Sequence, residues 1–228
     1  MKKFKWSNYP FPYAVIDNYL PTNTFNNLIN ELDHTDNLIQ EKFNTNLENK
    51  TIFKDIFSKQ NVKEIIQIMG SEEIKSVISK KINSKKIFSM RDIDNYAGYS
   101  PYHVTENSGC LGSHVDHSYI KKEEFQHIAN TIFFASTKWE KGWGGETIFF
   151  SNNGFIQKVK IAPIPNRLII FIHTANSFHG VSSYFSKSNI ERRTFYHDYY
   201  VRKNEIKKVM SFINSNRKKK LKHSFHET

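Results

Sequence analysis

Cysteine is nearly absent from this 228-residue sequence, in which Cys110 stands alone. A single cysteine cannot form a disulfide within the chain, which fits a reducing compartment. Long apolar runs are also missing, since no stretch approaches the roughly 20 residues that a membrane-spanning helix needs. The opening MKKFKWSNYP turns polar too early for the apolar region of a signal peptide. These absences predict a soluble, cytoplasmic protein with no membrane partner.

Acidic residues are few beside basic ones, with 22 Asp and Glu against 33 Lys and Arg, and the formal net charge is +11. Most of the excess lies at the end of the chain. From Arg202 to Thr228, nine Lys or Arg face two Glu, a net of +7 that leaves +4 for the rest. We interpret this tail as a solvated end, with docking on an acidic partner as the alternative. The distribution argues against a nucleic-acid partner.

Aromatic residues are plentiful, with 19 Phe and 11 Tyr, and hydrophobic residues make up 38% of the chain. A disordered chain would be poor in such residues, so this one is predicted to fold. Its length suits one domain with a substantial core. The sequence does not determine the oligomeric state.

The first 85 residues predict a mainly helical support region. Residues 9–20 (YPFPYAVIDNYL) read as an edge strand, and residues 21–32 (PTNTFNNLINEL) as a helix. Residues 61–85 show helical periodicity twice, with a break near Gly70-Ser71.

Short β-branched and aromatic runs between turn residues follow over residues 86–202 and predict strands of an antiparallel sandwich or barrel. Residues 203–228 allow a last helix and the basic tail. The expected class is α+β, mainly β, with one structural domain overall.

His114 and Asp116 are separated by one residue in a strand-forming context, so their side chains should share a face. His179, near the start of a later strand, can supply a third ligand. Two histidines and one carboxylate suit iron(II) and leave coordination positions open for other molecules.

Two rivals weaken this assignment when the triplet is considered by itself. His34 and Asp36 form a second H-x-D triplet, but it follows a helical pattern, and we interpret it as a helix end or loop. His173 lies six residues before His179 and is an alternative third ligand.

The order of the motifs that follow is more specific than any one of them. From about Met90 to Val201 the chain resembles the 2-oxoglutarate/iron(II) oxygenase superfamily, particularly its prolyl-4-hydroxylase-like branch. The resemblance is carried in sequence by Tyr102, His114-Val115-Asp116, a strand ending at Trp139, Gly144-Gly145-Glu146, Asn166-Arg167-Leu168, His179-Gly180-Val181 and Arg192-Arg193-Thr194.

This resemblance implies a double-stranded β-helix, the jelly-roll architecture of cupins, with flanking N-terminal helices. It implies a dioxygenase that uses Fe(II), 2-oxoglutarate and O₂, with ascorbate as a candidate addition. The expected metal ligands are His114, Asp116 and His179. Halogenases of this kind replace the carboxylate ligand with a small residue, so Asp116 favours hydroxylation.

The far carboxylate of 2-oxoglutarate needs a buried cation, and an arginine can donate two parallel hydrogen bonds to it. Arg192 is the candidate, with Thr194 on the same face of the strand and Arg193 on the other. Tyr102 and Thr131 are further candidates, with core packing as the alternative for Tyr102.

The substrate stays open between two classes. The resemblance points to hydroxylation of a prolyl or other peptidyl residue. A free small molecule, such as an amino acid, sugar or nucleotide derivative, is the alternative. A catalytically silent jelly-roll binding module is a third hypothesis, against which the complete ligand set argues.

Overall fold

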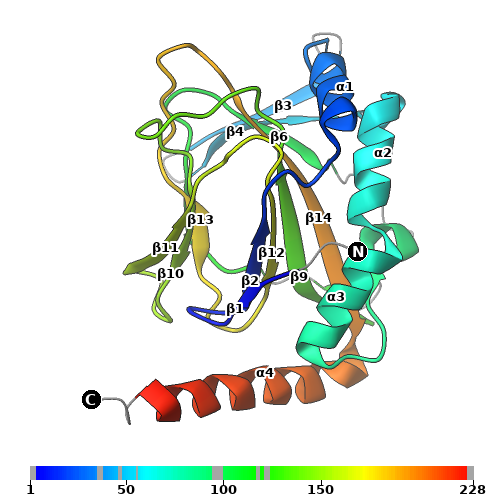
Figure 1. Ribbon diagram of the computed structural model, residues 1–228, viewed down its shortest axis with the longest axis vertical. Coiled ribbons are helices and arrows are strands. Elements are labelled where there is room, and N and C mark those ends of the chain that lie inside the picture. The colour runs from blue at the N-terminus through cyan, green and yellow to red at the C-terminus, as the bar shows by residue number, and fades with distance from the viewer. Residues whose placement is uncertain are drawn as a thin grey trace.

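A computed structural model of the chain describes residues 4–34, 38–45, 48–54, 56–93, 100–116, 119–120 and 124–224. Two antiparallel sheets form the body, and three helices cover one face of the larger sheet (Figure 1). None of the described helices is long and apolar enough to cross a membrane.

The larger sheet has the strand order β1-β2-β12-β9-β14-β6-β4-β3, and β5 and β8 pair with β14 and β9 beside this path. Its strands are β1 (Trp6–Ser7), β2 (Tyr13–Ile16), β3 (Gln40–Asn44), β4 (Asn49–Phe53), β5 (Phe88–Ser89), β6 (Tyr102–Thr105), β8 (Tyr119–Ile120), β9 (Phe125–Phe134), β12 (Leu168–Ile172) and β14 (Arg192–Arg202).

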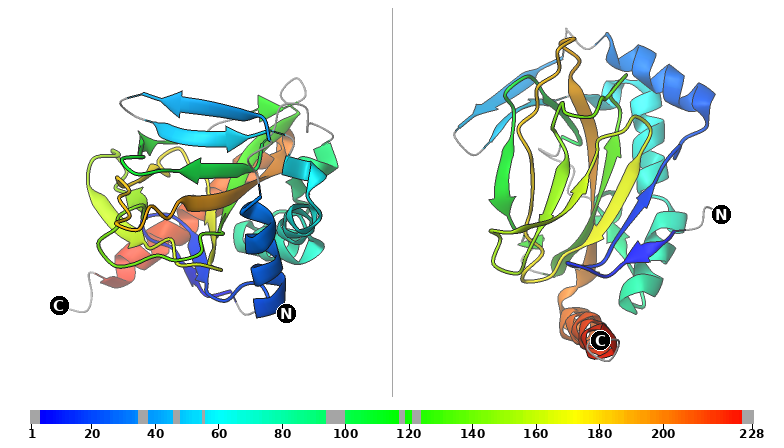
Figure 2. Two further views of the ribbon diagram at one scale, coloured as in Figure 1. Left: turned by 90° about the horizontal axis from the view of Figure 1, so that it is seen from above. Right: turned by 60° about the vertical axis from the view of Figure 1, so that its left-hand side comes forward.

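The smaller sheet faces it across an apolar interior (Figure 2). Its order is β11-β10-β13-β7, and its strands are β7 (Leu111–His114), β10 (Thr147–Phe150), β11 (Gln157–Ile161) and β13 (His179–Val181). Side chains that alternate along the strands of both sheets fill the space between them. Among them, Phe134, Phe149 and Phe171 are completely buried.

The helices are α1 (Thr22–Leu32), α2 (Gln60–Met69), α3 (Glu72–Ile82) and α4 (Lys203–Ser224), with short 3₁₀ turns at Ile56–Ser58 and Met90–Ile93. Glu31 of α1 accepts hydrogen bonds from the first backbone N–H groups of α2. Ser71 caps α3 by accepting from the N–H of Ile74. The break that Gly70-Ser71 predicts is therefore the α2–α3 junction.

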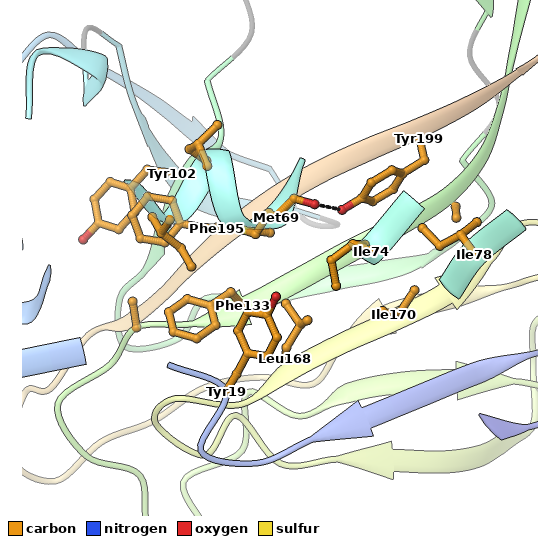
Figure 3. Close-up of a cluster of buried hydrophobic side chains, with 14 of the residues drawn as sticks. Tyr19, Met69, Ile74, Ile78, Tyr102, Phe133, Leu168, Ile170, Phe195 and Tyr199 are labelled. Atoms are coloured by element: carbon orange, nitrogen blue, oxygen red, sulfur yellow. Dashed lines mark hydrogen bonds between the residues drawn. The ribbon is translucent and has the colours of Figure 1, made fainter. Parts of the chain in front are cut away.

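A second core lies between these helices and the other face of the larger sheet (Figure 3). Met69 and Ile78 from the helices meet Phe133, Phe195 and Tyr199 from β9 and β14 there. The hydroxyl of Tyr199 donates to the carbonyl of Met69, which ties β14 to the end of α2.

The larger sheet thus has two buried faces, and all ten residues of β9 are buried. One face packs against the helices and the other lines the interior between the sheets.

The N-terminal region contains more strand than its sequence suggests. Between α1 and α2, strands β3 and β4 form a hairpin, and β4 pairs with β6 to extend the larger sheet. The apolar residues of the hairpin's two strands are Phe43, Ile52 and Phe53, so its strand signal is weak beside the helical patterns on either side. The hairpin therefore continues the larger sheet, within a region whose longest elements are helices.

Candidate metal centre and cosubstrate pocket

Two histidines and one aspartate meet at one end of the smaller sheet. His114 ends β7, His179 begins β13, and the two residues pair across the strands. Nε2 of His114 lies 3.3 Å from Oδ1 of Asp116, and Nε2 of His179 lies 3.3 Å from Oδ2. Their candidate ligand atoms all lie within 4.8 Å of one another. The structure thus brings together the three residues that the sequence predicts as metal ligands.

Backbone carbonyls orient both imidazoles. Nδ1 of His114 lies 2.8 Å from the carbonyl of Gly112, and Nδ1 of His179 lies 3.0 Å from that of Ser177. A carbonyl only accepts, so each Nδ1 carries a hydrogen and each Nε2 is left to bind a metal. The donor set fits a divalent cation such as Fe(II) in the two-histidine, one-carboxylate arrangement.

The surroundings of Asp116 and His114 favour the charged form of each. Burial by itself would raise the pKa of Asp116, but hydrogen bonds with His114 and His179 hold it well below its usual range. Burial would lower the pKa of His114, but its hydrogen bond with Asp116 leaves it raised overall. Asp116 is therefore ionised and ready to ligate a cation.

A pocket of about 440 Å³ opens beside these ligands. Both sheets contribute to its wall, and β4 adds Lys50. Apart from the three ligands, its polar lining comprises Lys50, Ser100, His103, His127, Asn130, Thr147, Tyr196 and Asp198.

Arg192 lies in the interior between the sheets, where it is 1% exposed. Its Nε donates to the carbonyl of Gly145 at 2.8 Å, and its guanidinium lies over the ring of Phe134. Nη2 lies 3.5 Å from the hydroxyl oxygen of Thr147, which lines the pocket. No carboxylate of the described residues pairs with Arg192. A buried cation without an anion is costly, so this position suits an anionic ligand such as the far carboxylate of 2-oxoglutarate.

Thr194 shares this inward side of β14 but its hydroxyl donates to the backbone carbonyl of His103. Tyr102 points to the opposite face, where it packs against Phe53 and Phe195 (Figure 3). The structure therefore does not bring Tyr102 to the pocket, and the core-packing alternative describes its surroundings.

Thr131 also faces the helices. Its hydroxyl lies 3.4 Å from the carbonyl of His197 and 3.3 Å from the hydroxyl of Tyr199. The structure does not bring Thr131 to the pocket either.

Residues next to these candidates occupy the pocket wall instead. His103 follows Tyr102 on β6 and packs against Tyr196 at a tilt, with 4.6 Å between ring centroids. Asn130 precedes Thr131 on β9. Sequence analysis missed both. His103 alternates with Thr105 along β6, a signal that could have indicated it, whereas the residues two positions from Asn130 are both isoleucine and give no such signal.

The alternative residues are less well placed for these roles. Nε2 of His173 is 4.0 Å from Oδ2 of Asp116, farther than that of His179. Arg193 forms ion pairs with Asp33 and Glu191 on the side of β14 away from the pocket. In the second triplet, Asp36 lies outside the described residues, and His34 lies in a turn after α1.

Comparison with known proteins finds a sequence match over residues 98–199, to the family described as the 2OG-Fe(II) oxygenase superfamily. This region contains all three candidate metal ligands and Arg192. No curated protein sequence matches the chain.

Solved structures of similar fold include several hydroxylases. A prolyl-4-hydroxylase from Pseudomonas putida is 12% identical with a TM-score of 0.59, covering 84% of this chain and 92% of its own. A prolyl hydroxylase from Trichoplax adhaerens, solved with a hypoxia inducible factor peptide fragment, is 16% identical with a TM-score of 0.56, covering 82% and 83%.

HygX from Streptomyces hygroscopicus, solved with nickel, 2-oxoglutarate and hygromycin B, is 9% identical with a TM-score of 0.54, covering 82% of each chain. At these identities the similarity concerns the fold, a double-stranded β-helix. Residues 98–199 thus match the 2OG-Fe(II) oxygenase superfamily in sequence, and both the fold and the His-Asp-His cluster agree with that match.

Proposed function

We propose that this oxygenase hydroxylates an unactivated C–H bond of a peptidyl residue, with proline as the first candidate. The observation that carries hydroxylation is the complete ligand set, in which Asp116 keeps its carboxylate between His114 and His179. A small residue at that position would instead leave room for a halide ion. The resemblance of the chain to prolyl hydroxylases supports the peptidyl substrate.

When bound, iron(II) and 2-oxoglutarate supply the oxidising chemistry, in which decarboxylation to succinate is coupled to hydroxylation. The protein binds and orients both. His114, Asp116 and His179 hold the metal through one side, which leaves the other side open to the pocket. Arg192 anchors the far carboxylate of 2-oxoglutarate and sets its distance from the metal. The apolar rings of Phe134 and Phe171 keep water from the interior between the sheets.

Turnover of 2-oxoglutarate tests the activity before any substrate is known. We expect the purified chain to release succinate with Fe(II) and O₂, and Asp116→Ala to abolish this release, since only three protein ligands hold the metal. The matched control is Asp36→Ala in the other H-x-D triplet, which should change turnover by less than about twofold, as a substitution away from such a site should. An active Asp116→Ala protein, or an inactive but folded Asp36→Ala protein, would contradict the assignment.

Product mass spectrometry tests the substrate. Proline-containing peptides should gain one oxygen atom and stimulate succinate release above the rate without substrate. A free small molecule is the second candidate, because HygX was solved with hygromycin B. Free amino acids and aminoglycosides therefore form the second arm of the screen. Hydroxylation confined to that arm would overturn the peptidyl proposal and leave the oxygenase assignment intact.

A further inference from the structure

The metal-binding carboxylate is held by a residue outside the ligand set. Nδ2 of Asn130 donates to Oδ2 of Asp116 at 3.0 Å. Asn130 lies on the interior face of β9, is 5% exposed, and pairs with Phe171 and Asp198 on the two neighbouring strands. Asn130 thus extends from a central strand of the larger sheet, and its side chain reaches the carboxylate of Asp116.

His127 lies on the same strand and lines the same pocket, because an irregularity in the pairing of β9 with β14 separates it from Ala129, and it determines which way the amide of Asn130 points. Nε2 of His127 lies 2.5 Å from Oδ1 of Asn130, 3.2 Å from the carbonyl of Ala129 and 3.7 Å from Oδ1 of Asp198. The Ala129 carbonyl only accepts, so Nε2 carries a hydrogen. The amide atom facing it must then be the oxygen, which leaves the NH₂ group of Asn130 for Asp116. Asp116 requires the same orientation of the Asn130 amide, because an ionised carboxylate only accepts hydrogen bonds and so must face the NH₂ group.

We propose that Asn130 and His127 are positioning residues that restrict Asp116 to binding the metal through one oxygen. With Oδ2 engaged by Asn130, Oδ1 is the oxygen left for the metal. A carboxylate that binds through both oxygens would occupy one of the positions that 2-oxoglutarate and O₂ need. The polar chain from His127 through Asn130 to Asp116 therefore keeps the site open as well as ordered.

The test measures binding in the absence of O₂, so it depends on neither turnover nor the substrate. Fe(II) affinity and the visible iron–2-oxoglutarate charge-transfer band are titrated for the whole chain. Asn130→Ala should weaken Fe(II) binding by about 10- to 100-fold and diminish the band at saturating iron, because loss of an outer-shell partner has effects of this size. Fe(II) affinity within about twofold of wild type, together with an unchanged band, would overturn the proposal.

Thr131→Ala is the matched control. Thr131 is adjacent on β9 and completely buried, but it bonds to the helix-facing side of the sheet. This variant should keep wild-type iron affinity and band intensity even if its melting temperature falls. Equal loss in Thr131→Ala and Asn130→Ala would show that both merely disturb β9, and would overturn the positioning role.

His127 provides the second arm. His127→Phe removes the group that orients the amide and should weaken iron binding in the same direction as Asn130→Ala. His127→Gln can still donate to Oδ1 of Asn130 and should restore most of the affinity. A His127→Phe protein that binds Fe(II) with wild-type affinity would overturn the role assigned to His127. Failure to find a peptidyl substrate affects none of these readouts, so the proposal and the proposed function can fail separately.

Discussion

At the scale of single residues, Arg192 carries a buried positive charge that no carboxylate of the described residues balances. Its guanidinium is buried, donates to Gly145 and lies near Thr147, yet no carboxylate of the described residues faces it. Arg192→Ala should therefore raise the 2-oxoglutarate requirement strongly, since truncating one partner of a buried, hydrogen-bonded charge pair costs on the order of 2–5 kcal/mol. Fe(II) affinity should not change. Anaerobic titration of the charge-transfer band with 2-oxoglutarate measures the effect.

Arg193 is the matched control for that experiment. It is adjacent on β14 but faces away from the pocket and pairs with Asp33 and Glu191. Arg193→Ala should leave 2-oxoglutarate binding nearly unchanged. The assignment of faces on β14 is wrong if Arg193 is the sensitive position and Arg192 is not.

The metal ligands and the inward arginine were predictable because motif order and two-residue spacing fix them relative to one another. The polar lining of the pocket was not. Tyr102 and His103 lie on opposite faces of β6, as Thr131 and Asn130 do on β9. Where both faces of a sheet are buried, the alternation of apolar and polar residues no longer tells which face lines the site. The choice of Tyr102 and Thr131 thus fell one residue away from the pocket.

At the scale of elements, the turn before β10 couples stability to the site. Gly144 and Gly145 have φ of +73° and +72°, and a Cβ on Gly144 would lie 1.9 Å from the backbone oxygen of Ser183. Gly142 has φ of +97° but open space around it. Alanine at position 142 or 144 would incur about 1–2 kcal/mol of strain from the left-handed backbone conformation. Gly144→Ala would add a clash with the backbone of Ser183. We expect Gly144→Ala to lower the free energy of unfolding well beyond Gly142→Ala.

Urea denaturation of both variants checks this prediction. Because Arg192 donates to the carbonyl of Gly145, Gly144→Ala should also raise the 2-oxoglutarate requirement, whereas Gly142→Ala should not. Equal stability losses in the two variants would show that backbone strain alone, and not the close approach of Ser183, makes glycine necessary there.

The packing of β14 on the helices predicts a dependence of stability on pH. His197 is completely buried beside α2, and its ring nitrogens have no hydrogen-bond partner among the described residues. Burial, with a smaller effect of the Arg91 charge, lowers the pKa of His197 to about 3. Between that value and the ordinary pKa of about 6.5, the unfolded chain binds more protons than the folded one.

Stability should therefore be highest above pH 6.5 and fall as the pH decreases toward 3. Urea denaturation at several pH values measures the slope. His197→Leu keeps an apolar side chain there and should reduce the slope over this window. An unchanged slope would mean that other groups cause the pH dependence.

The boundaries of helices and strands were predictable where the local sequence contains a capping or turn residue. The break at Gly70-Ser71 was predictable because Ser71 is a helix cap, and the short strands after residue 86 were predictable from their turn residues. The β3–β4 hairpin was not, since β3 is largely exposed and gains its order from the pairing of β4 with β6. Such long-range pairing leaves little trace in a polar local sequence.

At the scale of the whole molecule, charge and packing separate along α4. Figure 1 shows this helix running from the end of β14 along one end of the body. Val209 and Ile213 in its first half are 1% and 3% exposed and join the core between the helices and the larger sheet. Residues 217–228 hold five Lys or Arg and one Glu, so their removal lowers the net charge from +11 to +7.

Deleting residues 217–228 should change the free energy of unfolding by no more than about 0.5 kcal/mol, because the anchoring residues remain. Ile213→Ala should cost about 2–5 kcal/mol, as large-to-small core substitutions do. Urea denaturation compares the two, and Fe(II) titration should show an intact site in the truncated chain. If the tail docks on an acidic partner, truncation should remove both that binding and its salt dependence. A truncation as destabilising as Ile213→Ala would show that the tail packs on the domain and is not a solvated end.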